Sequence, residues 1–441
     1  MNNINNEGIY DARVLGRPRM IVLGLQHMFA MFGATILVPI ITGIDVSTTL
    51  AMAGLGTLLF HLFTQMKVPA FLGSSFAFLG GYATIAPRLA DGSANTEMLP
   101  YACIGVAAAG LLYIILAIIV KMIGINKVLR YFPPIVTGPI IIAIGLGLAP
   151  TAIDNCSHNW IVALVALSIV IYCNIFAKGM WKITPILLGI VGTYLVCIVV
   201  GNIIGVESYA VDFSSVKEAA WIGFPIAWKQ TVFGGVHDWM YTISAIIAIM
   251  PIALATIMEH IGDISAIGAT CNKNFMENPG LHRTLLGDGC ATIMASLFGG
   301  PANTTYGENT GVLALSKVYD PRVVRIAALF AIFFSFCPKF AAVINSMPAA
   351  LVGGISFVLY GMIAAIGIRN MVENKIQFSQ SRNTIIAGVI LVCALGLKNG
   401  VSFSIGSFNI TLSALAVAAL AGIFLNAIIK PEKCDTLEKE K

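Results

Sequence analysis

The chain has 441 residues, of which 58% are apolar and only 11% are charged, and its formal net charge is +5. This composition excludes a soluble globular protein, which carries about 25% charged residues, and a disordered chain, which has far less apolar surface. Nine cysteines without regular spacing exclude a disulfide scaffold. The class that remains is an all-α polytopic membrane protein in the lipid bilayer.

Apolar stretches recur along the chain at the length that a membrane span requires, which is about 20 residues. In chain order they lie near residues 20–42, 47–65, 71–87, 100–120, 132–150, 159–177, 183–204, 239–262, 284–299, 303–318, 323–345, 347–367, 382–397 and 410–429. They predict fourteen transmembrane segments, of which the third and tenth are the weakest as plain helices.

The distribution of basic residues predicts the orientation. Arg13, Arg17 and Arg19 precede the first span and place the N-terminus in the cytoplasm. With fourteen alternating spans, only five of the 26 Lys and Arg residues fall on the opposite side, and these are Arg88, Lys217, Lys229, Lys339 and Lys398. Both termini are therefore predicted to be cytoplasmic. Because no basic patch is present, a nucleic-acid partner is not expected.

Features of the first half recur in the second half in the same order. Gln26-His27 corresponds to Glu259-His260, Ser74-Ser75-Phe76 to Thr304-Thr305-Tyr306, and Pro133 and Gly138 to Pro348 and Gly353. A set of seven spans ends on the opposite side of the membrane from where it began, so the second set of seven runs in the opposite orientation. We therefore expect a 7+7 inverted repeat, which is typical of secondary transporters.

The third and tenth stretches predict interrupted helices. Pro69 precedes Gly73–Phe78, and Gly299-Gly300-Pro301 precedes Asn303–Glu308. Pro and Gly interrupt helices, whereas hydroxyl-bearing and aromatic residues favour extended backbone. We expect a short extended segment and a half-helix in each, with a substrate site between them near the bilayer midplane. The alternative is a pair of kinked helices without a ligand.

Carboxylates inside the membrane are costly and therefore point to function. Glu259 and Glu308 are expected to lie deep, and no Lys or Arg within their spans is available as a local partner. Asp263 follows Glu259 by four residues and shares its helix face. Like charges at that distance oppose each other's ionisation, so one of the two is expected to hold a proton, as proton coupling requires.

Other polar residues in the spans have structural explanations. Asp263 alternatively lies at the cytoplasmic end of its span, near Lys273 and Arg283. Asp288 is closer still to that end and is expected to be structural. His27 is expected to form a hydrogen bond between helices rather than contact substrate.

No metal, cofactor or enzyme active site is predicted. Glu259 and His260 are adjacent, so on a helix they point about 100° apart. No HExxH or CxxC spacing occurs in the chain. Nucleophile-elbow and phosphate-loop patterns are also missing, so the sequence predicts a transporter rather than an enzyme.

These residues carry a family resemblance that extends from about Leu23 to Leu425. The chain resembles the nucleobase–ascorbate transporter family, also called nucleobase:cation symporter-2, and is most similar to its bacterial uracil permeases. The matching motifs are Leu25–His27, Phe32–Thr35, Gly73–Phe78, Glu259–Gly262 and Asn303–Val312. The family signature reads Glu308-Asn309-Thr310-Gly311 here and ends in Ser316-Lys317, where Ser316 replaces the more usual Thr.

The resemblance implies a core domain of spans 1–4 and 8–11 and a gate domain of spans 5–7 and 12–14. In this chain it places a cytoplasmic segment at 1–19, the core domain at 20–125 and 238–345, the gate domain at 126–237 and 346–430, and a cytoplasmic tail at 431–441. It implies uptake of a nucleobase across the plasma membrane, the bacterial inner membrane, by an elevator-type motion in a homodimer. The proton is the implied coupling ion, and no cofactor is implied.

The resemblance also implies roles for individual residues. Glu259 and Glu308 bind the base through their side chains, Phe76 and Gly307 offer backbone groups, and Ala34, Tyr306 and Tyr360 pack around the ring, with Tyr360 coming from the gate domain. Glu259 and Asp263 carry the proton, and Gln26, His27 and Asn309 support the site through helix contacts.

Two positions bear on the substrate and the proton route. Purine-selective relatives commonly have Gln where this chain has Glu308, so this residue favours a pyrimidine, and uracil offers two N–H donors to carboxylates. Asp263 departs from the His expected in uracil permeases, and purine relatives often have Asp there. The proton route at this residue therefore stays open.

Three other functions compete with a uracil:proton symporter. The first is a symporter of xanthine or another purine. The second is an anion exchanger or channel of the same fold, which would favour Lys or Arg near the broken spans, where the sequence has none. The third is a receptor or scaffold, which would bind its ligand without net uptake.

Overall fold

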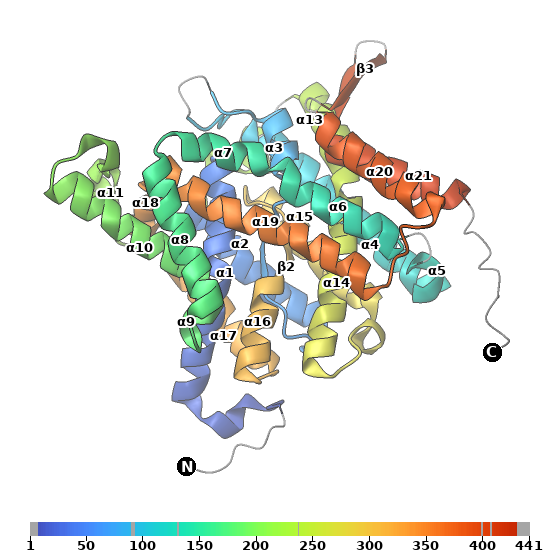
Figure 1. Cartoon of the computed structure of the whole chain (residues 1–441), viewed down its shortest axis with the longest axis horizontal. Coiled ribbons are helices and arrows are strands. Elements are labelled where there is room, and N and C mark those ends of the chain that lie inside the picture. The colour runs from blue at the N-terminus through green and yellow to red at the C-terminus, as the bar shows by residue number, and fades with distance from the viewer. Residues whose placement is uncertain are drawn as a thin grey trace.

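The computed structural model describes residues 8–89, 93–129, 132–236, 238–397, 400–405 and 408–429, and it is mostly helical (Figure 1). The predicted tail 431–441, the first seven residues and Lys398 lie outside this part. Within it, seven helical segments are long and apolar enough to cross a membrane: α1 (Arg17–Thr42), α2 (Val46–Phe63), α4 (Leu99–Ile123), α6 with α7 (Pro134–Gly147 and Ala149–Ser157), α10 with η2 (Pro185–Cys197 and Ile198–Ile203), α13 with η5 and α14 (Trp239–Ile249, Met250–Ile252 and Ala253–Cys271), and α19 (Ala349–Glu373).

Shorter helices complete the bundle. Those of intermediate length are α8 (Trp160–Phe176), α15 (Leu281–Leu297), α16 (Gly307–Ser316), α17 (Pro321–Ser335), α18 (Pro338–Asn345), α20 (Ser381–Gly396) and α21 (Ala414–Ile428). The shortest are η1 (Ala12–Leu15), α3 (Leu79–Ile85), α5 (Ile125–Leu129), α9 (Met180–Ile183), η3 (Glu207–Tyr209), α11 (Ser214–Glu218), η4 (Trp228–Gln230), α12 (Val232–Gly235) and η6 (Met276–Gly280). Each predicted apolar stretch coincides with one or more of the helices.

Local chemistry explains the turn between the first two long helices. α1 ends where Gly43 adopts a φ of 84° and donates its N–H to the Pro39 carbonyl, a left-handed cap that glycine reaches without strain. α2 begins at Asp45, whose carboxylate accepts from the Thr48 N–H at 2.6 Å. Gln230 of the long connection before α13 binds this turn, since its Oε1 accepts from the Asp45 N–H at 2.9 Å.

The stretch 323–345, predicted as a single span, is broken. α17 and α18 meet at 86°. Pro338 is the first residue of α18, and a proline disfavours helical backbone at the residue before it. Cys337 accordingly has a non-helical φ of −111° and ψ of 89°, so the chain turns here.

Two small antiparallel sheets interrupt the helices. β1 (Leu72–Ser74) pairs with β2 (Asn303–Thr305), with Gly73 opposite Thr304. Each strand is three residues long. β1 begins one residue before the predicted segment Gly73–Phe78, and β2 occupies the first half of Asn303–Glu308. β3 (Val401–Ile405) pairs with β4 (Phe408–Leu412). This hairpin was not predicted, and the last apolar stretch, expected from residue 410, begins in β4 before α21 starts at Ala414.

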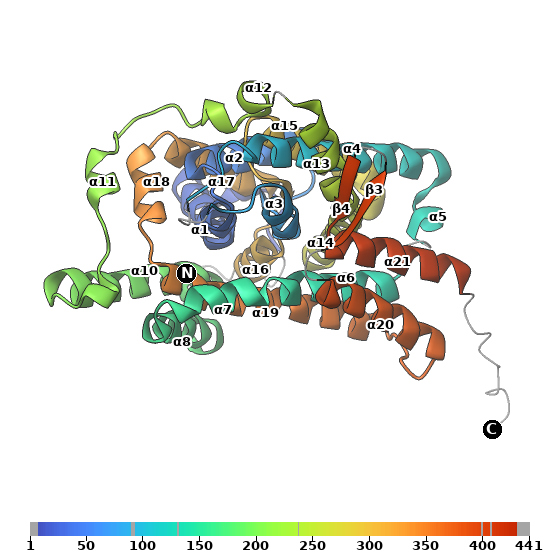
Figure 2. The same cartoon turned by 90° about the horizontal axis from the view of Figure 1, so that it is seen from above.

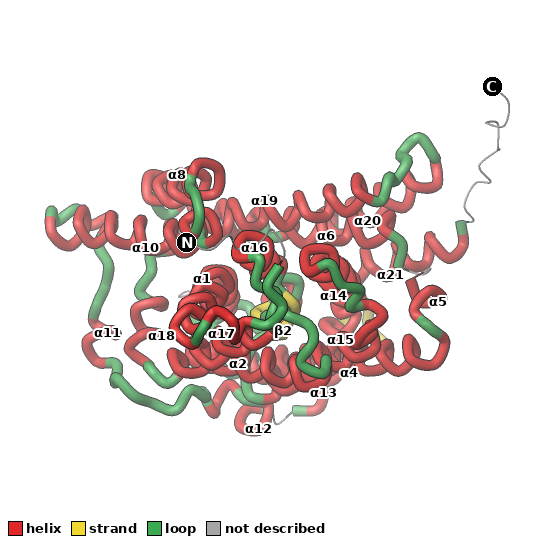
Figure 3. The backbone as a smooth tube through the Cα atoms, turned by 90° about the horizontal axis from the view of Figure 1, so that it is seen from below, coloured by secondary structure: helices red, strands yellow, loops and turns green. Residues whose placement is uncertain are grey.

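The helices form two layers with the short strands between them. Figure 2 shows α6, α7, α8, α19 and α20 in one layer and α1, α2, α4, α15 and α17 in the other. α19 packs against α6, α7 and α8, whereas α15 packs against α2 and α4, and α17 against α1 and α2. The named helices of the first layer lie between residues 134 and 176 and between 349 and 396, and those of the second lie between 17 and 123 and between 281 and 335. α14, α16 and β2 lie between the layers (Figure 3).

Candidate functional site

The site is built where the two short strands meet. Backbone bonds extend the pairing beyond the strands, because the Tyr306 N–H donates to the Phe71 carbonyl at 3.0 Å and the Ser75 N–H to the Ala302 carbonyl at 2.9 Å. All six strand residues are buried. Buried backbone groups need partners, and each strand supplies them to the other, so neither extended segment is satisfied alone.

Polar side chains of neighbouring helices hold the outer edges of these strands. The Thr57 hydroxyl of α2 accepts from the Leu72 N–H at 2.9 Å. The Thr292 hydroxyl of α15 donates to the Asn303 carbonyl at 2.7 Å, and the Asn303 amide donates to the Met52 carbonyl at 2.8 Å. These bonds anchor the extended backbone to the layer that contains α1, α2 and α15. Without them, the apolar residues of the two segments would favour a helix.

Tyr306 joins the two strands through its side chain. Its hydroxyl donates to the Ser74 carbonyl at 2.7 Å, and the Ser74 hydroxyl donates to the Thr35 carbonyl of α1 at 3.1 Å. Gly73 makes room for the Tyr306 ring, since a Cβ at Gly73 would lie 2.6 Å from two ring carbons. The Tyr306 ring is therefore fixed beside β1, with only 5% of the residue exposed.

Asp263, one of the predicted acidic pair on α14, faces the start of α16. The Thr305 hydroxyl donates to Asp263 Oδ2 at 3.1 Å, and Asp263 Oδ1 lies 3.7 Å from where a Cβ on Gly307 would be. Glu259 and Asp263 are both partly buried, and Glu259 lies one turn earlier on the same helix face. Glu308 is the second residue of α16, and its side chain lies outside the described part of the structure.

Aromatic residues of both layers meet next to this acidic region. Phe76, just after β1, contacts Tyr360 of α19 with ring centroids 6.0 Å apart and ring planes at 74°, the edge-to-face geometry that aromatic pairs prefer. Ala34, Phe76, Tyr306 and Tyr360 belong to one buried apolar cluster. The structure therefore shows direct contact between Phe76 and Tyr360 and places Ala34 and Tyr306 in the same buried cluster.

The expected helix contact involves α1 and α16. The Asn309 amide lies 3.3 Å from the His27 carbonyl, to which it donates, and 3.4 Å from His27 Nδ1. Gln26 precedes His27 in α1 and is partly buried. The contact fixes the first turn of α16, and with it Gly307, against α1.

Comparisons with known proteins assign the chain to a family. Residues 18–403 match the model of a family described as a permease family. The chain is 41% identical to the uracil permease of Bacillus caldolyticus, in an alignment that covers 98% of this chain and 97% of that protein. The chain belongs to this permease family. It is also 38% identical to the uracil permease of Bacillus subtilis strain 168, with 94% of each chain covered.

The permease shares its fold with transporters of low sequence identity. The transmembrane domain of a cyanobacterial bicarbonate transporter, BicA, superposes with a TM-score of 0.59 at 16% identity and covers 95% of this chain and 100% of that chain. A murine anion transporter, solute carrier 26 family member A9 in its inward-facing state, gives a TM-score of 0.64 at 11% identity over 97% of this chain and 73% of that chain. The predictions of a nucleobase–ascorbate transporter relative and of a transporter rather than an enzyme are confirmed.

A buried polar pair links α14 to α15. His260 Nδ1 lies 3.1 Å from Asp288 Oδ2, and His260 Nε2 lies 3.0 Å from the Thr284 hydroxyl. The rings of Phe60 and Tyr113 meet the His260 ring edge-on. This contact between α14 and α15 agrees with the structural role predicted for Asp288.

Sequence reasoning missed the residues that hold the permease site in shape. Thr57, Thr292 and Thr305 each bind a strand or an acidic residue through a hydroxyl. Thr305 stands next to Tyr306 in a motif that was identified, and a hydroxyl beside a helix break was the available indication of its role. Thr57 and Thr292 lie within apolar helices and carry no such indication.

Proposed function

We propose that this permease takes up uracil together with protons across the plasma membrane. The chain would cross the membrane fourteen times as a 7+7 inverted repeat, with both termini cytoplasmic. The uracil permeases of Bacillus caldolyticus and Bacillus subtilis, at 41% and 38% identity over nearly the whole chain, support the substrate. A homodimer is part of the proposal and rests on the resemblance alone.

The observation that carries the proposal is the position of Asp263 against the start of α16, with Glu259 one turn earlier on the same helix. Uracil has two N–H donors and two carbonyl acceptors, and carboxylates accept from N–H groups. The first N–H groups of a helix have no partner within the helix, so those of α16 can donate to the carbonyls of the base. Phe76 and Tyr306 offer flat apolar surface for its ring.

The same acidic pair supports proton coupling. Two carboxylates one turn apart in a partly buried place oppose each other's ionisation. One proton shared between Glu259 and Asp263 would lower the charge of the site before it crosses the membrane, where each charge is costly. The Thr305 hydroxyl donates to Asp263 at 3.1 Å, so a polar group already stands beside the pair that is proposed to carry the proton.

The two helix layers support an elevator-type motion. The strands and α16 pack with α1, α2 or α15, and Tyr360 belongs to α19 of the other layer. α14, which carries the acidic pair, lies between the layers and contacts both α15 and α6. A rigid displacement of one layer would carry Glu259 and Asp263 past Tyr360. Its ring lies against Phe76 in this structure.

Uptake in proteoliposomes tests the proposal. Labelled uracil should enter faster as the external pH falls, and an uncoupler should abolish accumulation. Asp263→Asn should weaken the response to pH, whereas Glu207→Gln, an exposed residue in a connection, should leave it unchanged. Accumulation that survives the uncoupler would disprove proton coupling.

A competition panel tests the substrate. Unlabelled uracil should compete most strongly, with thymine, xanthine and hypoxanthine weaker. A purine is the alternative substrate, because purine-transporting relatives often have Asp at the position of Asp263. Stronger competition by xanthine than by uracil would favour a purine. Saturable binding without net uptake would indicate a receptor instead.

A further inference from the structure

A pocket far from the proposed uracil site gathers basic side chains. It has a volume of about 480 Å³ and lies where the N-terminal segment, residues 8–15, crosses the ends of several helices. Four basic residues line it, and they are Lys67, Lys273, Arg322 and Arg325. They come from three places: the α2–β1 connection, the loop after α14, and α17. Only two acidic residues line the same pocket, Asp11 and Asp320.

Both acidic residues pair with the same arginine. Arg322 Nη1 lies 2.8 Å from Asp11 Oδ1 and 3.2 Å from Asp320 Oδ2. In the described part of the chain, Lys67, Lys273 and Arg325 form no ion pair with a carboxylate. Among the described residues, three cationic groups of this pocket therefore have no carboxylate within ion-pair distance.

The contacts that these three groups do make are neutral. Lys67 Nζ donates to the Asn278 side chain at 2.6 Å. Lys273 Nζ lies 4.5 Å from the centre of the Tyr10 ring. The partly buried Arg325 reaches the Met66 sulfur at 3.5 Å. Neutral partners leave most donors of two ammonium groups and a guanidinium free for an anion.

The wall of the pocket is held in place by the N-terminal segment. The Ile9 N–H donates to the Lys317 carbonyl at 2.7 Å, and the Ile9 carbonyl accepts from the Tyr319 N–H at 2.8 Å. The Tyr10 hydroxyl donates to the Cys271 carbonyl at 2.8 Å, at the end of α14. The pocket is thus a built cavity with fixed walls rather than a chance group of surface side chains.

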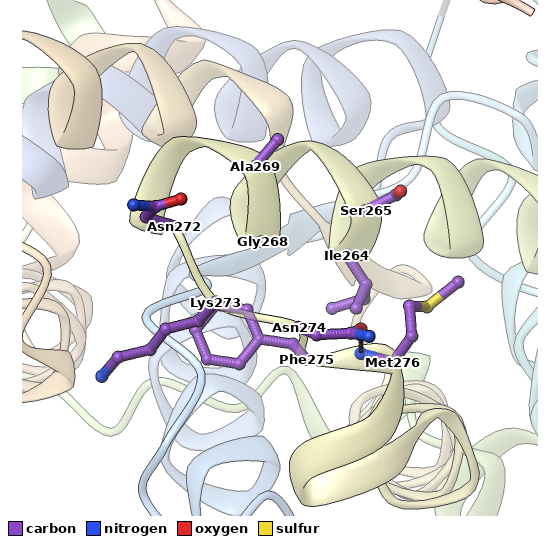
Figure 4. A pocket seen from close by; sticks show the side chains of 9 residues that line it. All are labelled: Ile264, Ser265, Gly268, Ala269, Asn272, Lys273, Asn274, Phe275 and Met276. Carbon is purple, nitrogen blue, oxygen red and sulfur yellow. Dashed lines mark hydrogen bonds between the residues drawn. The ribbon is translucent and has the colours of Figure 1, made fainter.

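A neighbouring pocket shows that the charge is not a general property of this region. It has a volume of about 390 Å³, lies along the last turns of α14 (Figure 4) and shares Lys273 and Phe275 with the first pocket. Its other lining residues are uncharged, including Ser265 and Asn272. Basic residues do gather on the cytoplasmic face of membrane proteins, but that bias does not make them converge on one cavity.

We propose that the 480 Å³ pocket binds a phosphate-bearing anion. Phosphate oxygens accept from a guanidinium in a two-point contact and from ammonium groups as point charges. Arg325 supplies the first, and Lys67 and Lys273 supply the second. The phosphate comes either from an anionic lipid headgroup at the bilayer surface or from a soluble phosphate compound. Its binding would join α17 to the α2–β1 connection and the end of α14, and the last two adjoin elements that carry the site described above.

Thermal unfolding of the full chain tests the proposal. In neutral detergent micelles, inorganic pyrophosphate should raise the melting temperature above that in sodium chloride of equal ionic strength. Lys67→Gln and Arg325→Gln should each weaken the apparent affinity for pyrophosphate about tenfold, the loss expected for one charge-assisted contact. The matched control is Lys178→Gln, an exposed lysine that does not line the pocket, and it should bind as the parent chain does. Because Lys67 is exposed, its variant stays informative if Arg325→Gln fails to fold.

A second arm separates the two sources. The chain in nanodiscs of phosphatidylcholine is compared with the chain in nanodiscs that also contain phosphatidylglycerol, without pyrophosphate. Stabilisation by phosphatidylglycerol that Lys67→Gln reduces assigns the pocket to a lipid headgroup, and stabilisation by pyrophosphate alone assigns it to a soluble phosphate. No stabilisation in either arm, or an equal loss in Lys178→Gln, would overturn the proposal.

Discussion

Replacing Gly307 with alanine separates folding from transport at the start of α16. Within the described residues, the nearest atom to the added Cβ is Asp263 Oδ1 at 3.7 Å, an ordinary van der Waals contact. The position is the first residue of a helix, where alanine loses less conformational freedom on folding than glycine. We therefore expect Gly307→Ala to be as stable as the parent chain, or more stable by about 0.4–1 kcal/mol.

Transport should respond in the opposite direction. The new methyl group fills the space beside Asp263 in which the base is proposed to bind, and an overpacked contact costs about 1–3 kcal/mol. The affinity for uracil should fall roughly 5- to 150-fold at that cost. The assay is the concentration dependence of uracil uptake in proteoliposomes, measured beside the melting temperature of the same preparation.

Gly73→Ala is the matched control because it should lower the stability of the fold, which Gly307→Ala should not. Its Cβ would lie 2.6 Å from two carbons of the Tyr306 ring and 2.7 Å from the Thr35 hydroxyl, so it should lower the stability by about 1–3 kcal/mol. Normal uracil affinity in Gly307→Ala would refute the placement of the base. A melting temperature as low as that of Gly73→Ala would refute the steric reasoning.

Three further predictions concern single groups. Tyr306→Phe removes a hydroxyl that donates to the backbone of β1, so unfolding in detergent should become easier by about 1–3 kcal/mol, and unchanged stability would contradict that bond. Glu308→Ala should abolish high-affinity uracil uptake in proteoliposomes, and near-normal uptake would exclude its proposed role. Hydrogen bonds from the side chain and backbone of Arg13 hold the pKa of Asp11 well below its usual range. The ionised Asp11 carboxylate therefore helps to hold the N-terminal segment in place above about pH 4, and this stabilisation is lost as the pH falls further. A spin label at the exposed Val14 should become more mobile in acid, and the same pH dependence in Asp11→Asn would contradict this.

The sequence predicted the elements whose causes are local. Apolar stretches of the right length located the helices. Pro69 and the Gly299-Gly300-Pro301 run located the two extended segments, because proline and glycine interrupt a helix through their own backbone properties. The break at Pro338 could have been predicted in the same way, because a proline restricts the backbone of the residue before it. It was missed because the surrounding apolar residues suggested one uninterrupted span. The hairpin also had a readable pattern, since Val401-Ser402-Phe403-Ser404-Ile405 alternates as a strand does.

The rest depends on contacts that no local pattern encodes. The hydroxyls of Thr57 and Thr292 stabilise strands from other parts of the chain, and nothing in their own helices distinguishes them. The N-terminal segment is an extreme case, because the Ala12 N–H donates to the Asp320 carboxylate across 308 residues of sequence. Such partners are set by the assembled helices, so the basic pocket was not predicted.

The pairing of β1 with β2 also constrains how the protein is made. Ser74 and Tyr306, whose side-chain hydrogen bond closes the pair, are separated by 232 residues, so β1 is synthesised long before its partner strand. Unpaired backbone groups cost several kcal/mol each in hydrocarbon. In the proposed topology, in which β1 lies at membrane depth, the first strand lacks these backbone partners until the second strand is made. The paired strands beside the proposed uracil site can therefore form only after most of the chain has been translated.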